Sequence, residues 1–321
     1  MAKKPGKKHI TITYIIVYKF YTLLGRVCKL LFSIFSPSKL STDRELSDLS
    51  LVLFCGQKGA KMLRPVLLSI YTTWEKIPPV TIITDGTPKE YIESYLKFWP
   101  FPVQVKSWQE SAAFHLEKGR KSIVELSEIN VFGKKLMGIL AEAETRPILY
   151  CDTDIIWFGE PTLPARSPGK GCEVRISTDN IHSYHMPLLR YLKRLDMMEK
   201  SPVNSGMIYL SGSVYDHYQE FGQMMDFIKF FNEPFAEQTT FALIADHLGD
   251  KWTLNDVLLT IDDLHWPLIP RYYFSGSHFA RHHVMTKHSW FWRDALYVIL
   301  FKKKKRTVNS SSLVQNGKQL T

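Results

Sequence analysis

The sequence predicts an α/β fold in which parallel strands alternate with helices. Three short apolar runs, at 51–56, 79–86 and 101–108, are separated by two segments with helical character. Strands that alternate with helices are typical of β-α-β units, whose functional loops lie at the carboxyl ends of the strands. With 45% hydrophobic residues in 321, the chain can also bury a large core, which excludes a disordered, collagen-like or coiled-coil protein.

The elements follow one another in a regular order. LVLFCG at 51–56 is typical of a buried strand that ends in glycine, and a helix with an early proline is expected at 62–74. The second strand, at 79–86, ends in the turn signal Asp-Gly, and a helix with proline at its start is expected at 88–99. A third strand is expected at 101–108. CGQKGAK after the first strand matches neither G-x-G-x-x-G nor a P-loop, so a dinucleotide enzyme or P-loop kinase has no support.

The most informative segment is RPILYCDTDIIWFGEP at 146–161, which follows a predicted helix at 131–144. Its apolar start, ILYC, delivers Asp152 and Asp154 at the end of a strand. Two acids in such a region are costly to bury without a metal or a cationic partner, and they can turn towards one Mg²⁺ or Mn²⁺ ion. Such an ion would stabilise a diphosphate leaving group. The alternative is that Asp152 caps a turn and Asp154 pairs with a lysine.

The positive charge of the chain lies at its two ends. Residues 1–40 carry eight Lys or Arg and residues 302–321 carry six, and neither segment contains an acid. Positions 41–301 hold 27 basic and 31 acidic residues. A nucleic-acid-binding domain carries its basic surface on the fold itself, so the net charge of +10 does not indicate nucleic acid as a partner.

Both ends combine basic residues with apolar or aromatic ones. The apolar stretch 10–35 is interrupted by Lys19, Arg26 and Lys29, which fall on one face of a helix. It therefore lacks the roughly 20 uncharged residues that a membrane span needs and favours a helix in the membrane interface. At the other end, aromatic residues precede the basic cluster 302–306, and anionic lipid attracts such clusters. The alternative there is a core helix with a solvated tail.

Cysteine usage indicates neither a zinc site nor a disulfide framework. Cys28, Cys55, Cys151 and Cys172 lie far apart in the chain and include no C-x-x-C pair. A reducing compartment is the simplest interpretation.

In order and spacing, these segments resemble nucleotide-diphospho-sugar transferases of the GT-A fold, and the family 8 glycosyltransferases in particular. The segments that carry the resemblance are LVLFCG, the strand ending in Asp85, the helix with Lys134 and Lys135, YCDTDIIWF, VNSGMIYLSG (203–212), FAEQTTFALI (235–244) and SHFARHHVMTKHSWFW (277–292). The resemblance implies a GT-A type fold, with a Rossmann-like mixed sheet flanked by helices, at 41–292. A basic, membrane-associating segment at 1–40 and an apolar helix end with a basic tail at 293–321 would flank this domain.

The resemblance also implies roles for residues at the matching positions. Cys55-Gly56 and Asp85 would face the base and ribose of a UDP-like donor. The other implied residues are Lys134 or Lys135 at the nucleotide or its phosphates, Asp152 and Asp154 at the metal, Asn204, Ser205 and Gly206 near the transferred sugar, Gln238 with its neighbour Glu237 on the acceptor side, and Lys287 or Arg281 at the pyrophosphate. Ordinary interpretations exist for several of them: Asp85 and Asn204-Ser205-Gly206 as turn residues, Lys134 and Lys135 as a solvated helix face, and Gln238 as a polar residue at a helix start.

The last segment departs from the family 8 pattern of a His, a Gly about three residues later, and Lys-Pro-Trp. Here Lys287 is followed by His-Ser-Trp, and His278, His282 and His283 all remain candidates for the third metal ligand, with His278 favoured. Imidazole binds Mn²⁺ alongside carboxylates, and a Lys or Arg balances the charge of a leaving diphosphate. A polar surface turn is the alternative for these histidines.

The sequence thus predicts a glycosyltransferase that uses Mn²⁺ or Mg²⁺ and moves a sugar from a UDP-like nucleotide sugar to an acceptor hydroxyl. Retention is favoured over inversion. An inverting enzyme would need a carboxylate base, for which Glu237, Asp246 and the pair Asp262-Asp263 are candidates. The alternatives are a sugar nucleotidyltransferase, for which GQKGAKMLR would be a thin triphosphate loop, and a non-catalytic membrane-surface protein with a transferase-like fold.

The two basic ends add an expectation about place and acceptor. An anionic membrane surface is expected as a partner, with a glycan or lipid-linked acceptor. We expect a peripheral position on the cytoplasmic face of a membrane, and the alternative is a type II membrane protein with a lumenal domain.

Overall fold

The computed structural model describes residues 12–163, 171–253, 256–259, 276–278 and 285–302. For Pro234 and the segments 12–18, 257–259, 276–278 and 285–288 it describes the backbone alone. The predicted positions Arg281, His282, His283, Asp262 and Asp263 lie outside the described residues.

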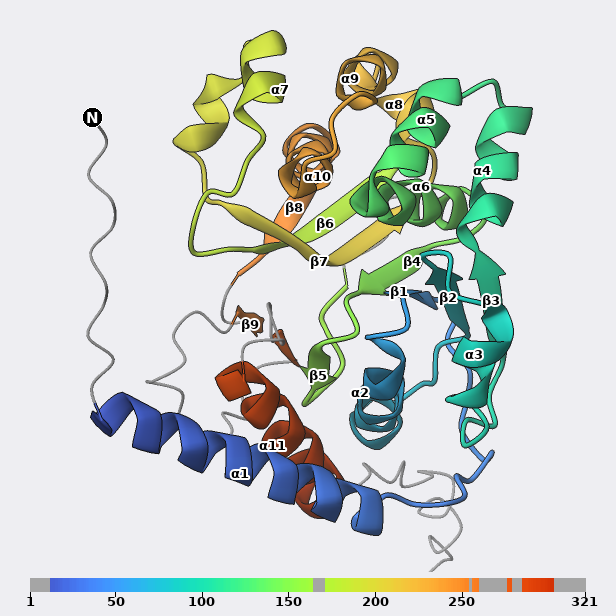
Figure 1. The fold of residues 1–321 in the computed structure, drawn as a ribbon. Coiled ribbons are helices and arrows are strands. Elements are labelled where there is room, and N and C mark those ends of the chain that lie inside the picture. Colours follow the sequence, from blue (N-terminus) through green and yellow to red (C-terminus); the bar gives the residue numbers. More distant parts are fainter. Residues whose placement is uncertain (1–11, 164–170, 254–255, 260–275, 279–284, 303–321) are drawn as a thin grey trace, which may run out of the picture.

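A seven-stranded mixed sheet forms the centre of the molecule (Figure 1), with the strand order β3-β2-β1-β4-β7-β6-β8. Its strands are β1 Ser50–Cys55, β2 Val80–Thr84, β3 Val103–Ser107, β4 Ile148–Cys151, β6 Glu173–Thr178, β7 Val203–Ser211 and β8 Gly249–Trp252. β1 to β4 are mutually parallel, whereas β7 runs antiparallel to both β4 and β6. The predicted β-α-β units and the mixed sheet are therefore confirmed.

A second, three-stranded sheet lies below the first in Figure 1 and has the order β5-β10-β9. Its strands are β5 Ile155–Trp157, β9 Val257–Leu259 and β10 Gly276–His278. β5 continues the chain after the turn that contains Asp152 and Asp154, so this turn joins the two sheets.

Helices cover both faces of the large sheet (Figure 1). The helices are α1 Ile12–Phe35, α2 Ala60–Thr73, α3 Lys89–Ser94, α4 Trp108–Glu117, α5 Lys121–Ile129, α6 Val131–Ala143, α7 Met186–Tyr191, a 3₁₀ turn at Leu195–Met198, α8 Val214–His217, α9 Phe221–Ile228, α10 Pro234–Leu248 and α11 Met285–Phe301. α4 to α6, α9 and α10 lie on one side, and α1, α2 and α11 on the other.

The alternation of side chains along β1 explains this arrangement. Leu51 and Leu53 point into a core that includes Leu67 of α2, and Val52 points into a second core that includes Leu136 of α6. Successive strand residues face opposite sides of a sheet, so a strand that is apolar throughout needs cover on both faces.

One predicted helix is shorter than expected. α3 ends at Ser94, although the pattern predicted a helix over 88–99. After Ser94 the backbone continues in tight turns, in which the amides of Tyr95 and Leu96 bond carbonyls three residues earlier. Pro100 disfavours the helical conformation in the residue before it, which limits how far the helix can continue.

Helix α1 packs along α11, so the first and the last described helices lie side by side (Figure 1). Cys28 and Phe32 of α1 share a core with Trp292 of α11. Helix α11 continues past residue 292, where the sequence analysis placed the end of the GT-A domain. All four cysteines are buried free thiols. Within the described residues, none of the helices has the length and apolarity that a membrane crossing requires.

Gly25 sets how closely α1 approaches α11. A Cβ atom at this position would lie 2.8 Å from the Cα of Ser289, whose hydroxyl donates to the carbonyl of Tyr21. Gly25→Ala should therefore lower the free energy of unfolding by about 1–3 kcal/mol through overpacking, measured by chemical denaturation. Gly222→Ala in α9 is the matched control, because nothing lies within 4 Å of its Cβ position. Equal stability of the two variants would contradict this close packing.

Candidate functional site

The acidic segment forms a turn at the carboxyl end of β4. The amide of Asp152 donates to the carbonyl of Gly206 in β7 at 2.8 Å, and the amide of Ile155 donates back to the carbonyl of Asp152 at 3.3 Å. Asp154 is buried at 7% exposure, whereas about a third of the Asp152 side chain is exposed. The turn therefore presents Asp152 at the edge of the sheet, as expected for residues that follow a parallel strand.

A buried lysine, Lys135, binds the carboxylate of Asp152 in this turn. Lys135 of α6 lies with its Nζ 3.4 Å from Asp152 Oδ1 and 3.2 Å from Glu237 Oε1 in α10. It also donates to the carbonyl of Ser205 at 2.9 Å, and the Ser205 hydroxyl donates to Glu237 Oε2 at 2.9 Å. Tyr150 of β4 adds a hydrogen bond from its hydroxyl to Asp152 Oδ1. Four separate elements thus meet at one cation.

The charges in this network shift one another's pKa values. Burial alone lowers the pKa of Lys135, but the carboxylates of Asp152 and Glu237 raise it above the ordinary value. Burial raises the pKa of Glu237. The charge of Lys135 lowers this pKa and the charge of Asp152 raises it, so that the pKa ends above its ordinary value. Burial and the nearby Asp152 carboxylate also raise the pKa of Tyr150 far above 10.0, so its hydroxyl stays protonated as a donor. The interpretation of Lys135 as a solvated helix residue is therefore wrong.

Lys134, the preceding residue, serves another part of the site. Its Nζ donates to the carbonyl of Asp85 at 2.8 Å and lies 4.6 Å from the centre of the Trp108 ring. The Asp85 carboxylate accepts from the amide and hydroxyl of Thr87, which orients it after β2. Asp85 is therefore also a turn residue, because its hydrogen bonds to Thr87 stabilise the turn before α3.

A cleft of about 510 Å³ opens beside these residues, and its lining consists of Gln57, Asp85, Gly86, Thr87, Pro88 and Tyr91. The loop after β1 forms one wall of the cleft. A Cβ atom on Gly56 would lie 2.1 Å from Asp85 Oδ2, so a larger residue would push this carboxylate out of its present position. Cys55 is buried, and burial followed by the charge of Asp85 raises its thiol pKa to about 12. Cys55 can therefore contribute to the cleft only through its backbone.

The same loop also touches the acidic turn. A Cβ on Gly59 would lie 3.1 Å from the Thr153 hydroxyl, between the two aspartates. On the other side of the turn, the backbone of His278 in β10 pairs with Ile155, the residue after Asp154. The structure thus brings His278 next to the acidic turn, as the resemblance implied, although the two positions are more than 120 residues apart in sequence.

The remaining predicted residues have different surroundings. Asn204 donates to Asp179 at 3.1 Å, and its side-chain oxygen accepts from the amide of Gly206. Asn204, Ser205 and Gly206 open strand β7 and do not form a simple turn. Gln238 donates to the carbonyl of Ser183 at 3.1 Å. Lys287 lies in the first turn of α11, and only its backbone is described.

Metal-ligating side chains do not gather in one place within the described part of the chain, where no three His, Cys, Asp or Glu lie close enough to hold an ion. Asp152 and Asp154 are nevertheless adjacent in one turn, and the backbone of β10 places His278 beside them. Two carboxylates and an imidazole are the donor types that suit Mn²⁺. The residues present are therefore chemically compatible with such an ion.

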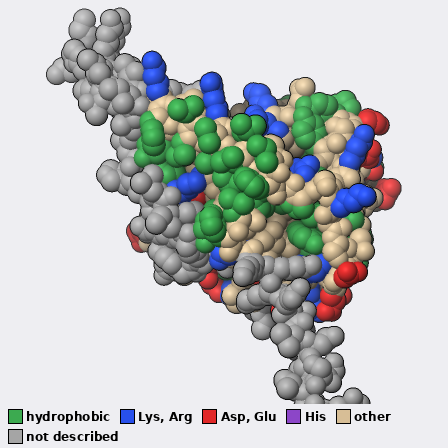
Figure 2. All heavy atoms as spheres, turned by 90° about the horizontal axis from the view of Figure 1, so that it is seen from below, with side chains coloured by type: hydrophobic (Ala, Val, Ile, Leu, Met, Phe, Trp, Pro, Cys, Tyr) green, Lys and Arg blue, Asp and Glu red, His purple; other side chains and the backbone are tan. Residues whose placement is uncertain are grey.

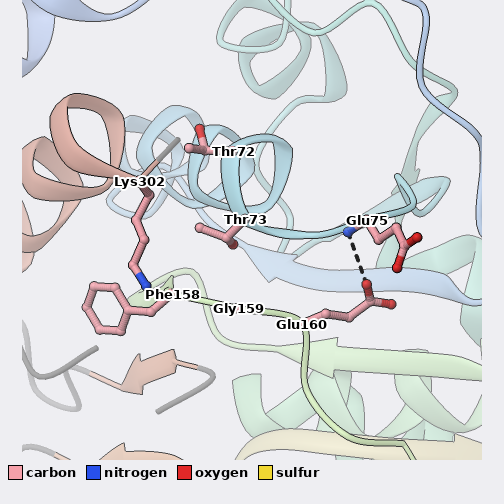
Figure 3. Close-up of a pocket in the computed structure, with 7 residues that line it drawn as sticks. All are labelled: Thr72, Thr73, Glu75, Phe158, Gly159, Glu160 and Lys302. Atoms are coloured by element: carbon pink, nitrogen blue, oxygen red, sulfur yellow. Dashed lines mark hydrogen bonds between the residues drawn. The ribbon is translucent and has the colours of Figure 1, made fainter. Parts of the chain in front are cut away.

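Another cavity, of about 400 Å³, lies at the far end of α2 (Figure 3). Its lining is Thr72, Thr73, Glu75, Phe158, Gly159, Glu160 and Lys302. The amide of Glu75 donates to Glu160 Oε2 at 3.1 Å across its wall. None of the predicted site residues lines this cavity.

Sequence reasoning did not identify Tyr150, Trp108 or Tyr91 as parts of the site. Tyr150 is the third residue of the apolar run ILYC, where a tyrosine fits a buried strand as well as Leu does. Its short distance in sequence from Asp152 is the only signal that could have found it. Trp108 and Tyr91 lie on helices α4 and α3, and their proximity to the site depends on how these helices pack in the folded chain.

Solved structures with a similar fold are glycosyltransferases. The apo structure of the WbbM bifunctional glycosyltransferase aligns with 82% of this chain and 51% of its own, at a TM-score of 0.52 and 10% sequence identity. Apo mouse xyloside xylosyltransferase 1 gives a TM-score of 0.48 at 12% identity, over 72% of this chain and 97% of its own. The galactosyltransferase LgtC with donor and acceptor sugar analogues gives 0.46 at 11% identity, over 77% and 95%.

At these identities the similarity concerns the fold alone. No family model matches the sequence. No curated protein sequence matches it either. The fold is nonetheless clear: the chain has the GT-A type architecture of glycosyltransferases, which confirms the predicted fold class. Membership of family 8 stays a prediction.

The support given by Lys135 can be measured. Lys135→Met should leave two carboxylates without their cation and lower the free energy of unfolding by about 3–5 kcal/mol in chemical denaturation. Adding Glu237→Gln should recover part of this loss, because one of the uncompensated charges is then gone. Lys134→Met, a half-buried neighbour on the same helix, is the control and should cost clearly less. Additive effects in the double variant would contradict the ion pair.

Proposed function

We propose that this protein is a metal-dependent glycosyltransferase that uses a nucleotide-diphosphate sugar, of the UDP-sugar class, and an acceptor hydroxyl. The observation that carries the proposal is the meeting of the acidic turn, the cleft beside Asp85 and the strand of His278 at one edge of the sheet. In open α/β sheets, ligands bind at the carboxyl ends of the strands. The GT-A type fold supports sugar transfer as the reaction.

Asp152, Asp154 and His278 would hold a Mn²⁺ or Mg²⁺ ion. When bound, the ion supplies positive charge that stabilises the departing diphosphate. The chain's own contribution is to hold the turn in place: Lys135 Nζ lies 3.4 Å from Asp152 Oδ1, and the Tyr150 hydroxyl donates to the same oxygen. Lys287, at the start of α11, would add positive charge at the pyrophosphate.

The cleft beside Asp85 would hold the nucleoside. Its lining offers an aromatic ring on Tyr91, the amide of Gln57 and the carboxylate of Asp85, which suit a base and a ribose hydroxyl. Lys134 lies beside this cleft, because its ammonium group donates a hydrogen bond to the carbonyl of Asp85. The loop between Gly56 and Gly59 connects the cleft to the acidic turn, so a nucleotide that lay along this loop would bring its diphosphate towards Asp152.

The surroundings of Asp246 and Glu237, the two candidate bases within the described residues, support the proposal of retention. Burial opposes ionisation of Asp246, but Lys200 and Arg194 bind its carboxylate, and its pKa lies below the ordinary value. Glu237 is 2% exposed and paired with Lys135. Neither is therefore well placed to take a proton from an acceptor hydroxyl, which an inverting reaction requires.

A sugar nucleotidyltransferase is less well supported. Such an enzyme would need a basic loop for a triphosphate after the first strand. Here α2 starts at Ala60, and the guanidinium of Arg64 donates to the carbonyl of Pro37 at 3.1 Å instead of lining the donor cleft. The acidic turn and the cleft together favour the transferase.

The proposed enzyme would act at an anionic membrane surface, on a glycan or lipid-linked acceptor, from the cytoplasmic face. The supporting observation is the outer side of α1, where Leu23, Val27, Leu30 and Ile34 are exposed at spacings of three and four residues. Figure 2 shows apolar side chains in the middle of this face, with Lys and Arg around them. This pattern is typical of helices that lie in a membrane interface.

The metal assignment is tested by binding. Asp152→Asn and Asp154→Asn should each lower Mn²⁺ affinity at least about tenfold, because a charged ligand is lost, as measured by electron paramagnetic resonance of free Mn²⁺. Asp250→Asn is the control, since Asp250 is exposed and pairs with Arg175. Unchanged Mn²⁺ binding in both site variants would refute the assignment. A protein that neither binds UDP nor turns over any nucleotide sugar would instead be the non-catalytic alternative.

The donor cleft is tested separately. Asp85→Asn should weaken UDP binding about tenfold by calorimetry, because a hydrogen bond to a charged acceptor is replaced by a neutral one. Mn²⁺ affinity in the absence of nucleotide should stay the same. If the variant bound UDP as tightly as the original chain, the nucleoside would not lie against Asp85.

A further inference from the structure

A pocket of about 360 Å³ opens on the other side of α3 from the donor cleft. Its walls come from α1, the first turns of α2, the end of α3 and α11. The residues that matter for its chemistry are Lys29, Lys61, Arg64, Lys97, Phe98 and Trp292. Four cations from three parts of the chain therefore surround one pocket, and none of its lining residues in the described part of the chain carries a carboxylate.

Two of these cations are held in place by aromatic rings of the same pocket. Lys29 Nζ lies 5.3 Å from the centre of the Trp292 ring, and the Arg64 guanidinium lies 5.0 Å from that of Phe98. Arg64 also donates to the carbonyl of Pro37. Contacts of this kind restrain long side chains that would otherwise move freely in solvent. Because like charges repel one another, this arrangement favours an anion between them.

The pocket borders the apolar side of α1. Lys29 precedes the exposed Leu30, and Phe32, one turn away from Lys29, is buried in the pocket wall. Arginine and lysine side chains beside aromatic rings are suited to the boundary between headgroups and acyl chains, where charge and apolar surface are both needed.

We propose that this pocket binds the phosphate group of an anionic phospholipid in the membrane on which α1 rests. The inference rests on the proposed membrane position and adds a defined headgroup site to it. Charge complementarity identifies the ligand class, since four cations without a lining carboxylate match a phosphate. The aromatic walls match the glycerol and upper acyl region beside that phosphate.

A headgroup in this pocket would also orient the enzyme. Tyr95 lines the pocket, and its hydroxyl lies 3.2 Å from that of Tyr91, which lines the donor cleft. The contact between Tyr91 and Tyr95 thus places the pocket next to the donor cleft. A lipid bound on one side of α3 would hold the donor cleft close to the membrane surface, where a lipid-linked acceptor hydroxyl would be found.

Vesicle binding tests the proposal, with two surfaces of equal charge density. One contains phosphatidic acid and the other contains cholesterol hemisuccinate, an anion without phosphate, in the same zwitterionic carrier lipid. The full chain should bind the phosphatidic acid vesicles more tightly in co-sedimentation. Lys61→Gln with Lys97→Gln should remove this preference and weaken binding to phosphatidic acid about tenfold or more. Both side chains are exposed, so the fold should tolerate the change.

The matched control is Lys19→Gln with Arg26→Gln, which removes the same charge from α1 outside the pocket. It should weaken binding to both surfaces by similar factors and keep the preference for phosphate. If the pocket variant behaves like this control, the headgroup site is refuted while the membrane position stands. If the full chain binds neither surface, both the site and the membrane position are refuted. The pocket variant should bind UDP as tightly as the original chain, whatever its binding to vesicles, because Lys61 and Lys97 do not line the donor cleft.

Discussion

A single buried cation holds the candidate site together. Lys135 reaches Asp152 after β4, Ser205 in β7 and Glu237 in α10, so its charge joins elements that are 17 to 102 positions away in the chain. Burying a lysine is unfavourable unless its charge and its donors are all compensated. Here two carboxylates and a carbonyl compensate it, and the consequence is a fixed position for the acidic turn. Metal and donor binding would both depend on this geometry.

The two faces of the sheet serve different purposes. On one face, α6 and α10 carry Lys135 and Glu237, which form the ion-pair network with Asp152 in the acidic turn. On the other face, α1, α2 and α11 pack around a separate core and present an outer surface that is apolar in the middle and basic around it (Figure 2). The donor cleft lies between these regions, at the loops after β1 and β2. The proposed chemistry and the proposed membrane contact should therefore respond to different substitutions.

Much of the fold could be predicted because apolar runs and turn signals are local. The strands at β1 to β4, the helix α6 and the position of Asp152 and Asp154 after a strand all follow from such patterns. The separate tasks of Lys134 and Lys135 could not be predicted, since adjacent helix residues point about 100° apart and their partners come from distant segments. α4 and α5 were not identified, although Ser107 and Glu110 form a capping box at the start of α4 and α5 has one apolar face.

Sequence alone determined the alternation of β1, β2 and β3 with helices, the amphipathic character of α1 and the acidic pair at the end of a strand, because each depends on residues within a few positions of one another. Tertiary structure alone decided that His278 pairs beside Asp154, that Tyr150 and Lys135 engage Asp152, and that four cations surround one pocket. These contacts join residues from distant parts of the chain or depend on which way neighbouring side chains point. Their geometry is set when helices and strands pack to bury apolar surface, and a linear pattern does not contain it.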